Sequence, residues 1–303
     1  MMGSGSFSGL THAMPRRRDQ TRRWPHAARS KEGSDTRDPT PFQKRRSLRV
    51  TDRPRTGNEA PPPGRRVALV TGGAVRVGRA ITLALADEGF DVVVGYHGSA
   101  DAAREVVAAV EGRGRRAHSV RADLATGAGA RALAEAATNA WGRLDLLVNN
   151  ASTFLATPFE EVGEEEWDQV MAVNLKAPFL LIQATAAALA ASRGSVVNIV
   201  DLSALRPWAR YPHHSVSKAA LAHLTRVAAR SLAPRVRVNA VAPGSVLPEE
   251  EATPEDIRAA AARIPLGGWG SPEDVARAVL FLDRSPFMTG EVIVVDGGAH
   301  GAT

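Results

Sequence analysis

Cysteine is absent from this chain of 303 residues. Its absence excludes disulfides, thiolate nucleophiles and cysteine-ligated metals, and no other spacing in the sequence indicates a metal site. Aromatic residues amount to only 5%. Neither a helix-turn-helix nor an alternation of basic and aromatic residues accompanies the many arginines, so nucleic-acid binding is not expected.

Long apolar runs are also lacking. No stretch was expected to approach the length of a membrane span, which needs about 20 apolar residues. The arginines at 16–18 are not followed by the apolar segment of a secretory signal. The sequence therefore favours a cytoplasmic protein with no membrane partner.

Charge is concentrated at the N-terminus. Residues 1–65 hold 15 Lys+Arg and 6 Asp+Glu, a net +9, so the total of +6 leaves −3 for the remainder. Residues 1–64 are rich in Arg, Pro, Ser and Gly and show no hydrophobic period. We expect 1–64 to be a disordered basic tail and 65–303 to be one folded domain.

After residue 64, short β-branched runs alternate with alanine-rich helical stretches, which is typical of repeated βαβ units. The runs 67–70 and 196–200 are apolar on both faces, as strands of a covered parallel sheet must be. The pattern predicts an α/β fold, a single Rossmann-type doubly wound parallel sheet of about seven strands with helices on both faces. The strands are expected near 66–71, 91–95, 115–121, 145–149, 195–200, 235–241 and 291–295, and the helices near 77–88, 100–112, 127–141, 164–190, 212–233 and 272–283.

A glycine-rich turn follows the first strand. It reads Thr-Gly-Gly-Ala-Val-Arg-Val-Gly over 71–78 and leads directly into a helix. Small residues there let the backbone approach a pyrophosphate, whose charge a helix N-terminus stabilises. Gly72, Arg76, Val77 and Gly78 are therefore candidate cofactor-binding residues.

The spacing of this turn resembles that of the short-chain dehydrogenase/reductase family, except that Arg76 replaces the middle glycine. An arginine there resembles the pteridine reductase branch; the simpler interpretation is a solvated arginine at a helix start. Other family-like segments follow in order along the chain. They add the cofactor candidates Asp123, Leu124, Asn150, Ala151, Ser152, Pro243, Gly244 and Ser245.

The second strand ends without an acid. A carboxylate there would accept hydrogen bonds from the ribose 2′-hydroxyl of NAD and repel the 2′-phosphate of NADP. The segment instead contains His97 and Ser99, which can donate to a phosphate. NADP(H) is therefore the expected cofactor, with Arg76 as a third donor.

The family resemblance also implies a catalytic set. Lys218 matches the family lysine and Asn174 the family asparagine, and Lys218 is expected to bind the cofactor as well. Asp201 stands where most members have serine, as in pteridine reductases. His214 stands four residues before Lys218, where the family has its tyrosine.

A histidine could take over the proton transfer of that tyrosine, since free imidazole titrates near neutral pH. Lys218 disfavours the imidazolium form of His214, whereas Asp201 favours it. Tyr211 is an alternative proton donor. Loss of reductase activity is the other interpretation, and it would leave an NADP(H)-binding protein with a regulatory or partner-binding role.

Aromatic residues indicate the substrate. Ser152 and Phe154 resemble the pair that contacts and stacks on the pterin in pteridine reductases, although Phe154 could equally be a core residue. Arg76, Asp201, Trp208 and Tyr211 complete the candidate substrate-binding set. The resemblance implies a pterin-like ring or a small carbonyl substrate, a substrate lid over 247–264, and a homotetramer.

Overall fold

The computed structural model describes residues 64–248 and 252–301. The tail expected over 1–64 lies outside the described residues except for Gly64, and so do lid residues 249–251. All seven predicted strands are present in one sheet, with the order β3-β2-β1-β4-β5-β6-β7. The strands are β1 Val67–Thr71, β2 Asp91–Tyr96, β3 Ala117–Arg121, β4 Leu146–Asn149, β5 Ser195–Ile199, β6 Arg237–Pro243 and β7 Val292–Val295.

Every pair of neighbouring strands is parallel. The strand order reverses between β1 and β4, which produces the crevice at the carboxyl ends where doubly wound sheets bind their ligands. The predicted fold is confirmed. The helices are α1 Arg76–Asp87, α2 Ala100–Glu111, α3 Gly127–Ala140, α4 Glu164–Met171, α5 Ala177–Ser192, α6 Pro212–Leu232, α7 Pro254–Ala261 and α8 Pro272–Arg284.

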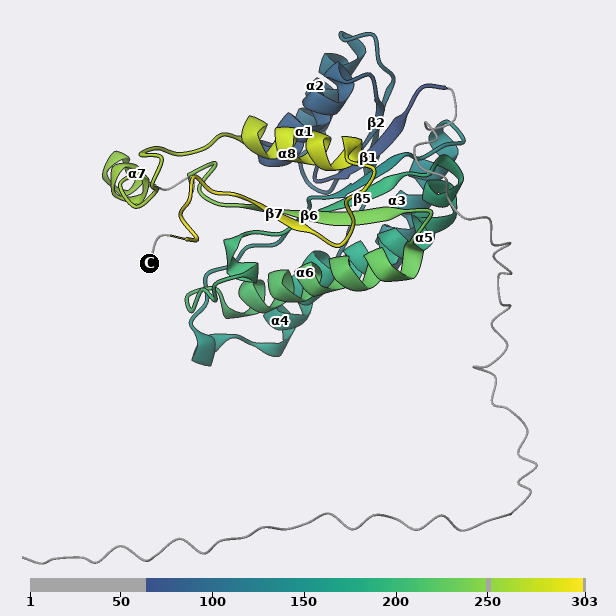
Figure 1. The fold of residues 1–303 in the computed structure, drawn as a ribbon. Coiled ribbons are helices and arrows are strands. Elements are labelled where there is room, and N and C mark those ends of the chain that lie inside the picture. The colour runs from purple at the N-terminus through teal and green to yellow at the C-terminus, as the bar shows by residue number, and fades with distance from the viewer. Residues whose placement is uncertain (1–63, 249–251, 302–303) are drawn as a thin grey trace, which may run out of the picture. The chain divides into compact units, whose positions relative to one another are not determined.

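Helices cover both faces of the sheet (Figure 1). On one face, Ala68 and Val70 of β1 belong to a buried cluster with side chains of α1, α2 and α8. On the other face, the alternate residues Val67 and Leu69 belong to a cluster with α3 and α5. Consecutive side chains of β1 thus enter two cores, which explains why residues 67–70 of the strand are all apolar.

The long helix predicted over 164–190 is interrupted. A π-helical turn over Ala172–Lys176 separates α4 from α5 and carries Asn174. The lid contributes a helix that sequence patterning did not predict, α7, whose N-terminus is closed by a capping box between Thr253 and Asp256.

The segment Glu164–Ser192 corrects the expectation about membrane spans. By length and composition alone it is apolar enough to cross a membrane, with a mean hydropathy of 1.4 over its most apolar window. Its first turn carries three glutamates, and Leu181 and Leu189 are buried in the core that α5 shares with α3. Those contacts are typical of a core helix in a globular domain.

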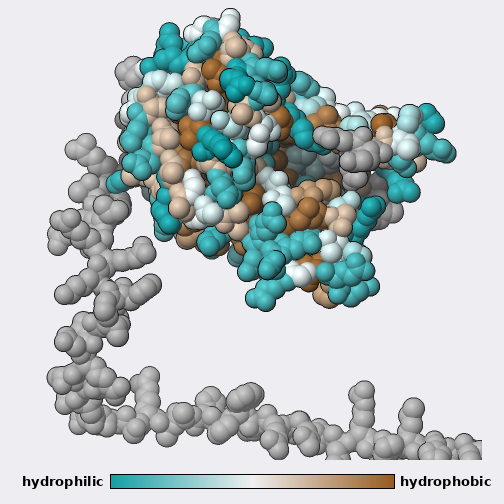
Figure 2. Space-filling view, turned by 180° about the vertical axis from the view of Figure 1, so that it is seen from behind, coloured by the Kyte–Doolittle hydropathy of each residue, from teal (hydrophilic) through white to brown (hydrophobic). Residues whose placement is uncertain are grey.

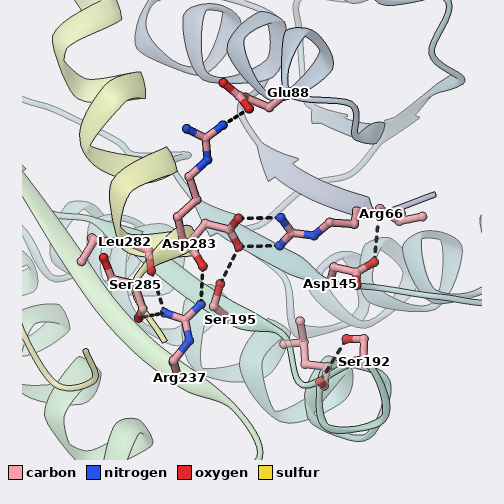
Figure 3. Close-up of polar contacts among 12 residues, drawn as sticks. Arg66, Glu88, Asp145, Ser192, Ser195, Arg237, Leu282, Asp283 and Ser285 are labelled. Carbon is pink, nitrogen blue, oxygen red and sulfur yellow. Dashed lines mark hydrogen bonds and ion pairs between the residues drawn. The ribbon is translucent and has the colours of Figure 1, made fainter. Parts of the chain in front are cut away.

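The end of the sheet opposite the crevice is held by a polar network (Figure 3). Arg66 donates two hydrogen bonds to the Asp283 carboxylate, at 2.8 and 2.7 Å. Ser195 Oγ donates to the same carboxylate at 3.2 Å, and Arg237 donates to main-chain carbonyls at the end of α8. The network ties the starts of β1, β5 and β6 to α8.

Candidate active site

The glycine-rich turn has a backbone that only glycine fits comfortably. Gly72 has a φ of +61°. A Cβ on Gly78 would lie 2.0 Å from the carbonyl oxygen of Gly72 and 2.6 Å from Asn150 Nδ2. Asn150 Nδ2 in turn donates to the carbonyl oxygens of Thr71 and Gly72, at 2.9 and 3.1 Å. Asn150 and Gly78 therefore shape the turn.

The N-terminus of α1 opens into this turn. Val75 precedes the helix and supplies no side-chain cap, so no side chain of the cap residue satisfies the first N–H groups of α1. An anion is stabilised at such a position by the N–H groups and the helix dipole. The helix N-terminus without a side-chain cap and the close packing of Gly78 against the backbone of Gly72 fit the pyrophosphate of a dinucleotide.

Arg76 adopts a φ of +52°, in the left-handed region that favours glycine. Its Nη2 atom lies 3.4 Å from the carbonyl oxygen of Pro248, at the start of the lid. The guanidinium is thus directed toward the segment after β6, on the opposite side of β1 from β2. Backbone strain of this kind is common at functional sites.

The end of β2 lies beside the end of β3. His97 and Ser99 are exposed, and His97 Nδ1 lies 3.8 Å from Asp123 Oδ1. Ser99 precedes α2 and its hydroxyl makes no capping hydrogen bond. Arg121 Nε donates to the carbonyl oxygen of His97 at 3.2 Å. The Arg121 side chain therefore lies beside the candidate cofactor-binding residues His97 and Ser99.

Arg121 was missed by sequence reasoning. Its position at the end of the third strand, two residues before Asp123, could have identified it, because parallel strands end at the same edge. Leu124, the neighbour of Asp123, is half-buried and packs against the core under α3 and α5.

Asn174 organises the loop after β4. Its Oδ1 accepts hydrogen bonds from Thr153 N at 2.8 Å and Ser152 Oγ at 3.2 Å. Its Nδ2 donates to Thr153 O and to Ser217 Oγ, each at 3.0 Å. Ala151 is fixed separately, because its N–H donates to Thr71 Oγ1. The Asn174 amide therefore joins the loop to α6.

His214 and Asp201 are paired. His214 Nε2 lies 2.6 Å from Asp201 Oδ2, and Asp201 Oδ1 accepts hydrogen bonds from the N–H and the hydroxyl of Ser203. The His214 side chain is 2% exposed and that of Asp201 is 19% exposed. Asp201 is therefore the member of the pair that solvent and ligands can reach.

The Asp201 carboxyl remains ionised despite its surroundings. Burial favours the neutral form, but the hydrogen bond from His214 and the charges of Lys218 and His214 together outweigh burial and lower the pKa of Asp201. Burial also lowers the pKa of the Lys218 ammonium, and the Asp201 carboxylate opposes part of that shift. Lys218 Nζ donates to the carbonyl oxygen of Ile199 at 3.0 Å.

Three aromatic rings gather around His214. Phe154 stacks on Tyr211 with ring centroids 4.3 Å apart and meets the edge of His214 at 4.6 Å. Trp208 lies 6.1 Å from Tyr211 and 6.4 Å from Phe154. Phe154 nevertheless remains 44% exposed. Phe154 is therefore a surface residue of the crevice. The alternative interpretation, that Phe154 is a core residue, is wrong.

The segment after β6 closes the crevice on its other side. A Cβ on Gly244 would lie 2.6 Å from Asp296 Cβ, so glycine allows Pro243, Gly244 and Ser245 to pass close to the turn after β7. Figure 2 shows a hollow between the lobe that carries α7 and the lobe that carries α4. The predicted catalytic and substrate-binding residues lie on the segments around this crevice.

Comparisons with known proteins identify the family. The family model described as enoyl-(acyl carrier protein) reductase matches residues 73–300. The chain belongs to the short-chain dehydrogenase/reductase family, and it is an NAD(P)-dependent oxidoreductase of that family.

Three similar proteins illustrate the range of the family. The 3-oxoacyl-[acyl-carrier-protein] reductase FabG of Staphylococcus epidermidis is 34% identical over 239 residues, covering 77% of this chain and 98% of FabG. An uncharacterized oxidoreductase of Methylorubrum extorquens is 40% identical over 245 residues, covering 78% and 98%. The crystal structure of FolM alternative dihydrofolate reductase 1 from Brucella suis in complex with NADP has a TM-score of 0.75 at 36% identity, covering 78% and 96%.

Proposed function

We propose that this protein is an NADPH-dependent reductase that transfers hydride to a pterin-like ring or, failing that, to a small carbonyl compound. The observation that carries the proposal is the Asp201–His214 pair beside Lys218, under an aromatic cluster at the crevice. The similarity to a protein named alternative dihydrofolate reductase supports a flat heteroaromatic substrate.

The cofactor would lie along the crevice at the carboxyl ends of the strands. Residues 72–78 would hold the pyrophosphate, Asp123 and Leu124 the adenine side, and Ser152 with residues 243–245 the nicotinamide side. β2 does not end in an acid, and His97 and Ser99 offer donors there, which supports NADP(H) over NAD(H). Lys218 would bind the nicotinamide ribose, as the family resemblance implies.

When bound, the reduced cofactor supplies a hydride to the substrate carbon, and the adjoining nitrogen or oxygen then requires one proton. His214 is the proposed source of that proton. Because its Nε2 faces Asp201 Oδ2 and Asp201 is the more exposed partner, the proton would reach the substrate through Asp201. In the same proposal Asn174 supports a water that replenishes the proton.

The substrate would stack on the exposed part of Phe154. Offset stacking adds about 0.5–1.5 kcal/mol beyond the burial of area. One part of the Phe154 ring is already covered by Tyr211, so the uncovered part would receive the substrate ring. Arg76, Ser152 and Trp208 would complete the pocket, with Arg76 reaching it from the opposite wall.

The test is the oxidation of NADPH by the purified protein with dihydropterins, quinones and aldehydes as substrates. The proposal expects turnover with at least one of them and a strong loss in Asp201→Asn. Turnover in Asp201→Asn equal to that of the wild-type protein would contradict the proposed proton route.

A second candidate function is an NADP(H)-binding protein without turnover. It is favoured by His214, whose two ring nitrogens both face partners within the protein. Binding of NADPH without turnover of any substrate in the same panel would support this second function and overturn the first.

Homotetramer formation by residues 65–303 and a cytoplasmic location are part of the proposal. A groove along α4 and α5 combines the apolar side chains of Met171, Leu175 and Phe179 with the polar Asp168, Gln169 and Lys176, and it is the surface that we propose for assembly. Light scattering of the full chain and of a chain without residues 1–60 should give the same tetramer and the same affinity for NADPH. A stable monomer at micromolar concentration would contradict assembly.

A further inference from the structure

Arg121 ends the edge strand β3, where it pairs in register with Tyr96 of β2. Its Nε donates to the carbonyl oxygen of His97 at 3.2 Å. This bond holds the guanidinium across the end of β2. In a doubly wound sheet, that is where the protein meets the ribose of the adenosine half of a dinucleotide.

The charge of Arg121 is not paired with a carboxylate of any described residue. Among residues 64–248 and 252–301, no ion pair includes Arg121. The nearest acid in sequence, Asp123, accepts the N–H of Ala125 at 3.0 Å and faces His97. By contrast, Arg113 and Arg116, which precede the same strand, are paired with Asp87 and Asp91.

We propose that Arg121 determines the specificity for the 2′-phosphate of NADP(H), with His97 and Ser99 as neighbouring donors. The proposal rests on the proposed use of NADP(H). Arg76 is the competing cation, but its guanidinium is directed toward Pro248 and the lid. In this proposal an arginine from the edge strand binds the 2′-phosphate. Arg76, which the sequence suggested as a third donor to that phosphate, instead contacts the pyrophosphate and the substrate.

Arginine suits this task for two reasons. Its planar guanidinium donates two parallel hydrogen bonds to a phosphate. The bond from Nε to the His97 carbonyl also fixes the long side chain before the ligand arrives, which reduces the conformational entropy lost on binding. A lysine would retain the charge and lose both features.

The test is the dissociation constant of the full chain for four ligands, measured by titration calorimetry. NADPH and 2′,5′-ADP carry the 2′-phosphate, whereas NADH and 5′-AMP lack it. Arg121→Gln should weaken NADPH and 2′,5′-ADP by about 10–100-fold, as expected for lost hydrogen bonds to a charged group. NADH and 5′-AMP should change by less than about twofold, as at an ordinary surface position.

Two variants serve as controls. Arg113→Gln removes the same charge at the opposite end of the sheet and should leave all four constants unchanged. Arg121→Lys should lose less affinity for 2′,5′-ADP than Arg121→Gln does. If Arg121→Gln fails to fold, the affinity of Arg121→Lys for the same four ligands provides the test. Arg76→Gly should weaken NADPH and NADH equally.

The outcomes separate this inference from the proposed function. A wild-type protein that binds NADH as tightly as NADPH contradicts the proposed cofactor. A wild-type protein that prefers NADPH, with the preference intact in Arg121→Gln, contradicts the role of Arg121 alone. Equal losses for all four ligands would assign Arg121 to the folding of the strand end and would also overturn the inference.

Discussion

His214 Nε2 lies 2.6 Å from Asp201 Oδ2. Each of the two side chains has a further hydrogen-bond partner within the protein. On the other side of the ring, Nδ1 lies 3.2 Å from the carbonyl oxygen of Thr153. Asn174 Nδ2 lies 3.4 Å from the same Nδ1 atom. His214 thereby connects the loop after β4 with the segment after β5.

Replacing His214 tests its role as the proton source. His214→Ala should lower kcat by about 10²–10⁴-fold, the usual contribution of a positioned acid or base, with the dissociation constant for NADPH preserved. His214→Tyr should retain or raise activity. Steady-state kinetics and calorimetric titration with NADPH give the two quantities.

His223 provides the matched control for that experiment, since it is an exposed histidine on the same helix, α6. His223→Ala should leave kcat unchanged. If His214→Ala turns over normally and Tyr211→Phe is inactive, the phenol of Tyr211 is the donor and the assignment of His214 is wrong.

Asp201 should make the stability of the protein depend on acid pH. Its folded-state pKa is lowered by His214 and Lys218 in spite of burial, so its contribution is complete above the unfolded-state pKa of about 3.9 and is lost as pH falls through the folded-state pKa. Asp201→Asn lacks this contribution. The free energy of unfolding should differ by about 1–3 kcal/mol at neutral pH, and the difference should shrink below the unfolded-state pKa.

Urea denaturation of both proteins between neutral pH and pH 2 measures this difference. A gap that stays constant or widens on acidification would show that the Asp201 carboxylate is not stabilised in the fold.

The sheet was predictable because its signals are local. Residues 67–70 are apolar at every position and residues 196–200 at every position except Asn198, as expected for strands covered on both faces. The glycine-rich turn was predictable for a similar reason, since Gly72 and Gly78 satisfy steric demands that neighbouring backbone imposes. Both features are encoded within a few residues of sequence.

The partners of His214 were not predictable in the same way. Asp201 was expected nearby from family resemblance, but the contact with the Thr153 carbonyl depends on how the loop after β4 is held by Asn174. Arg121 was missed because its hydrogen bond to His97 joins two strand ends that are 24 residues apart in sequence. Long-range contacts of this kind leave no periodic signal in the chain.

Arg76→Gly should stabilise the protein and impair its function. The φ of +52° at Arg76 costs a non-glycine residue about 1 kcal/mol, and glycine removes that cost. The free energy of unfolding should therefore rise by about 1 kcal/mol, while kcat/KM for NADPH-dependent reduction falls. Chemical denaturation and initial-rate kinetics on the same preparation measure both effects.

Arg193 supplies the control for this trade-off, because its φ of +56° is equally strained and it ends α5 at a distance from the crevice. Arg193→Gly should stabilise the fold without changing kcat/KM. Loss of stability in Arg76→Gly would show that contacts of the arginine outweigh its backbone strain.

The network around Asp283 should govern stability independently of cofactor binding (Figure 3). Asp283→Ala would leave the Arg66 guanidinium, which it binds through two hydrogen bonds, without its carboxylate. Removing one partner of a buried ion pair costs about 3–5 kcal/mol, and the partial exposure of Arg66 places the expected loss at the lower end, about 3 kcal/mol.

Arg284→Ala is the matched control, since Arg284 pairs with Glu88 on the surface and exposed pairs contribute about 0–1 kcal/mol. The double variant Arg66→Met with Asp283→Leu should lose less stability than Asp283→Ala, because it leaves no unpaired charge in the interior. Because the network lies at the opposite end of the strands from the crevice, the folded Asp283→Ala protein should bind NADPH with unchanged affinity. A weakened affinity, measured at a temperature where the variant is fully folded, would mean that strain passes along β1 or β5 to the cofactor edge.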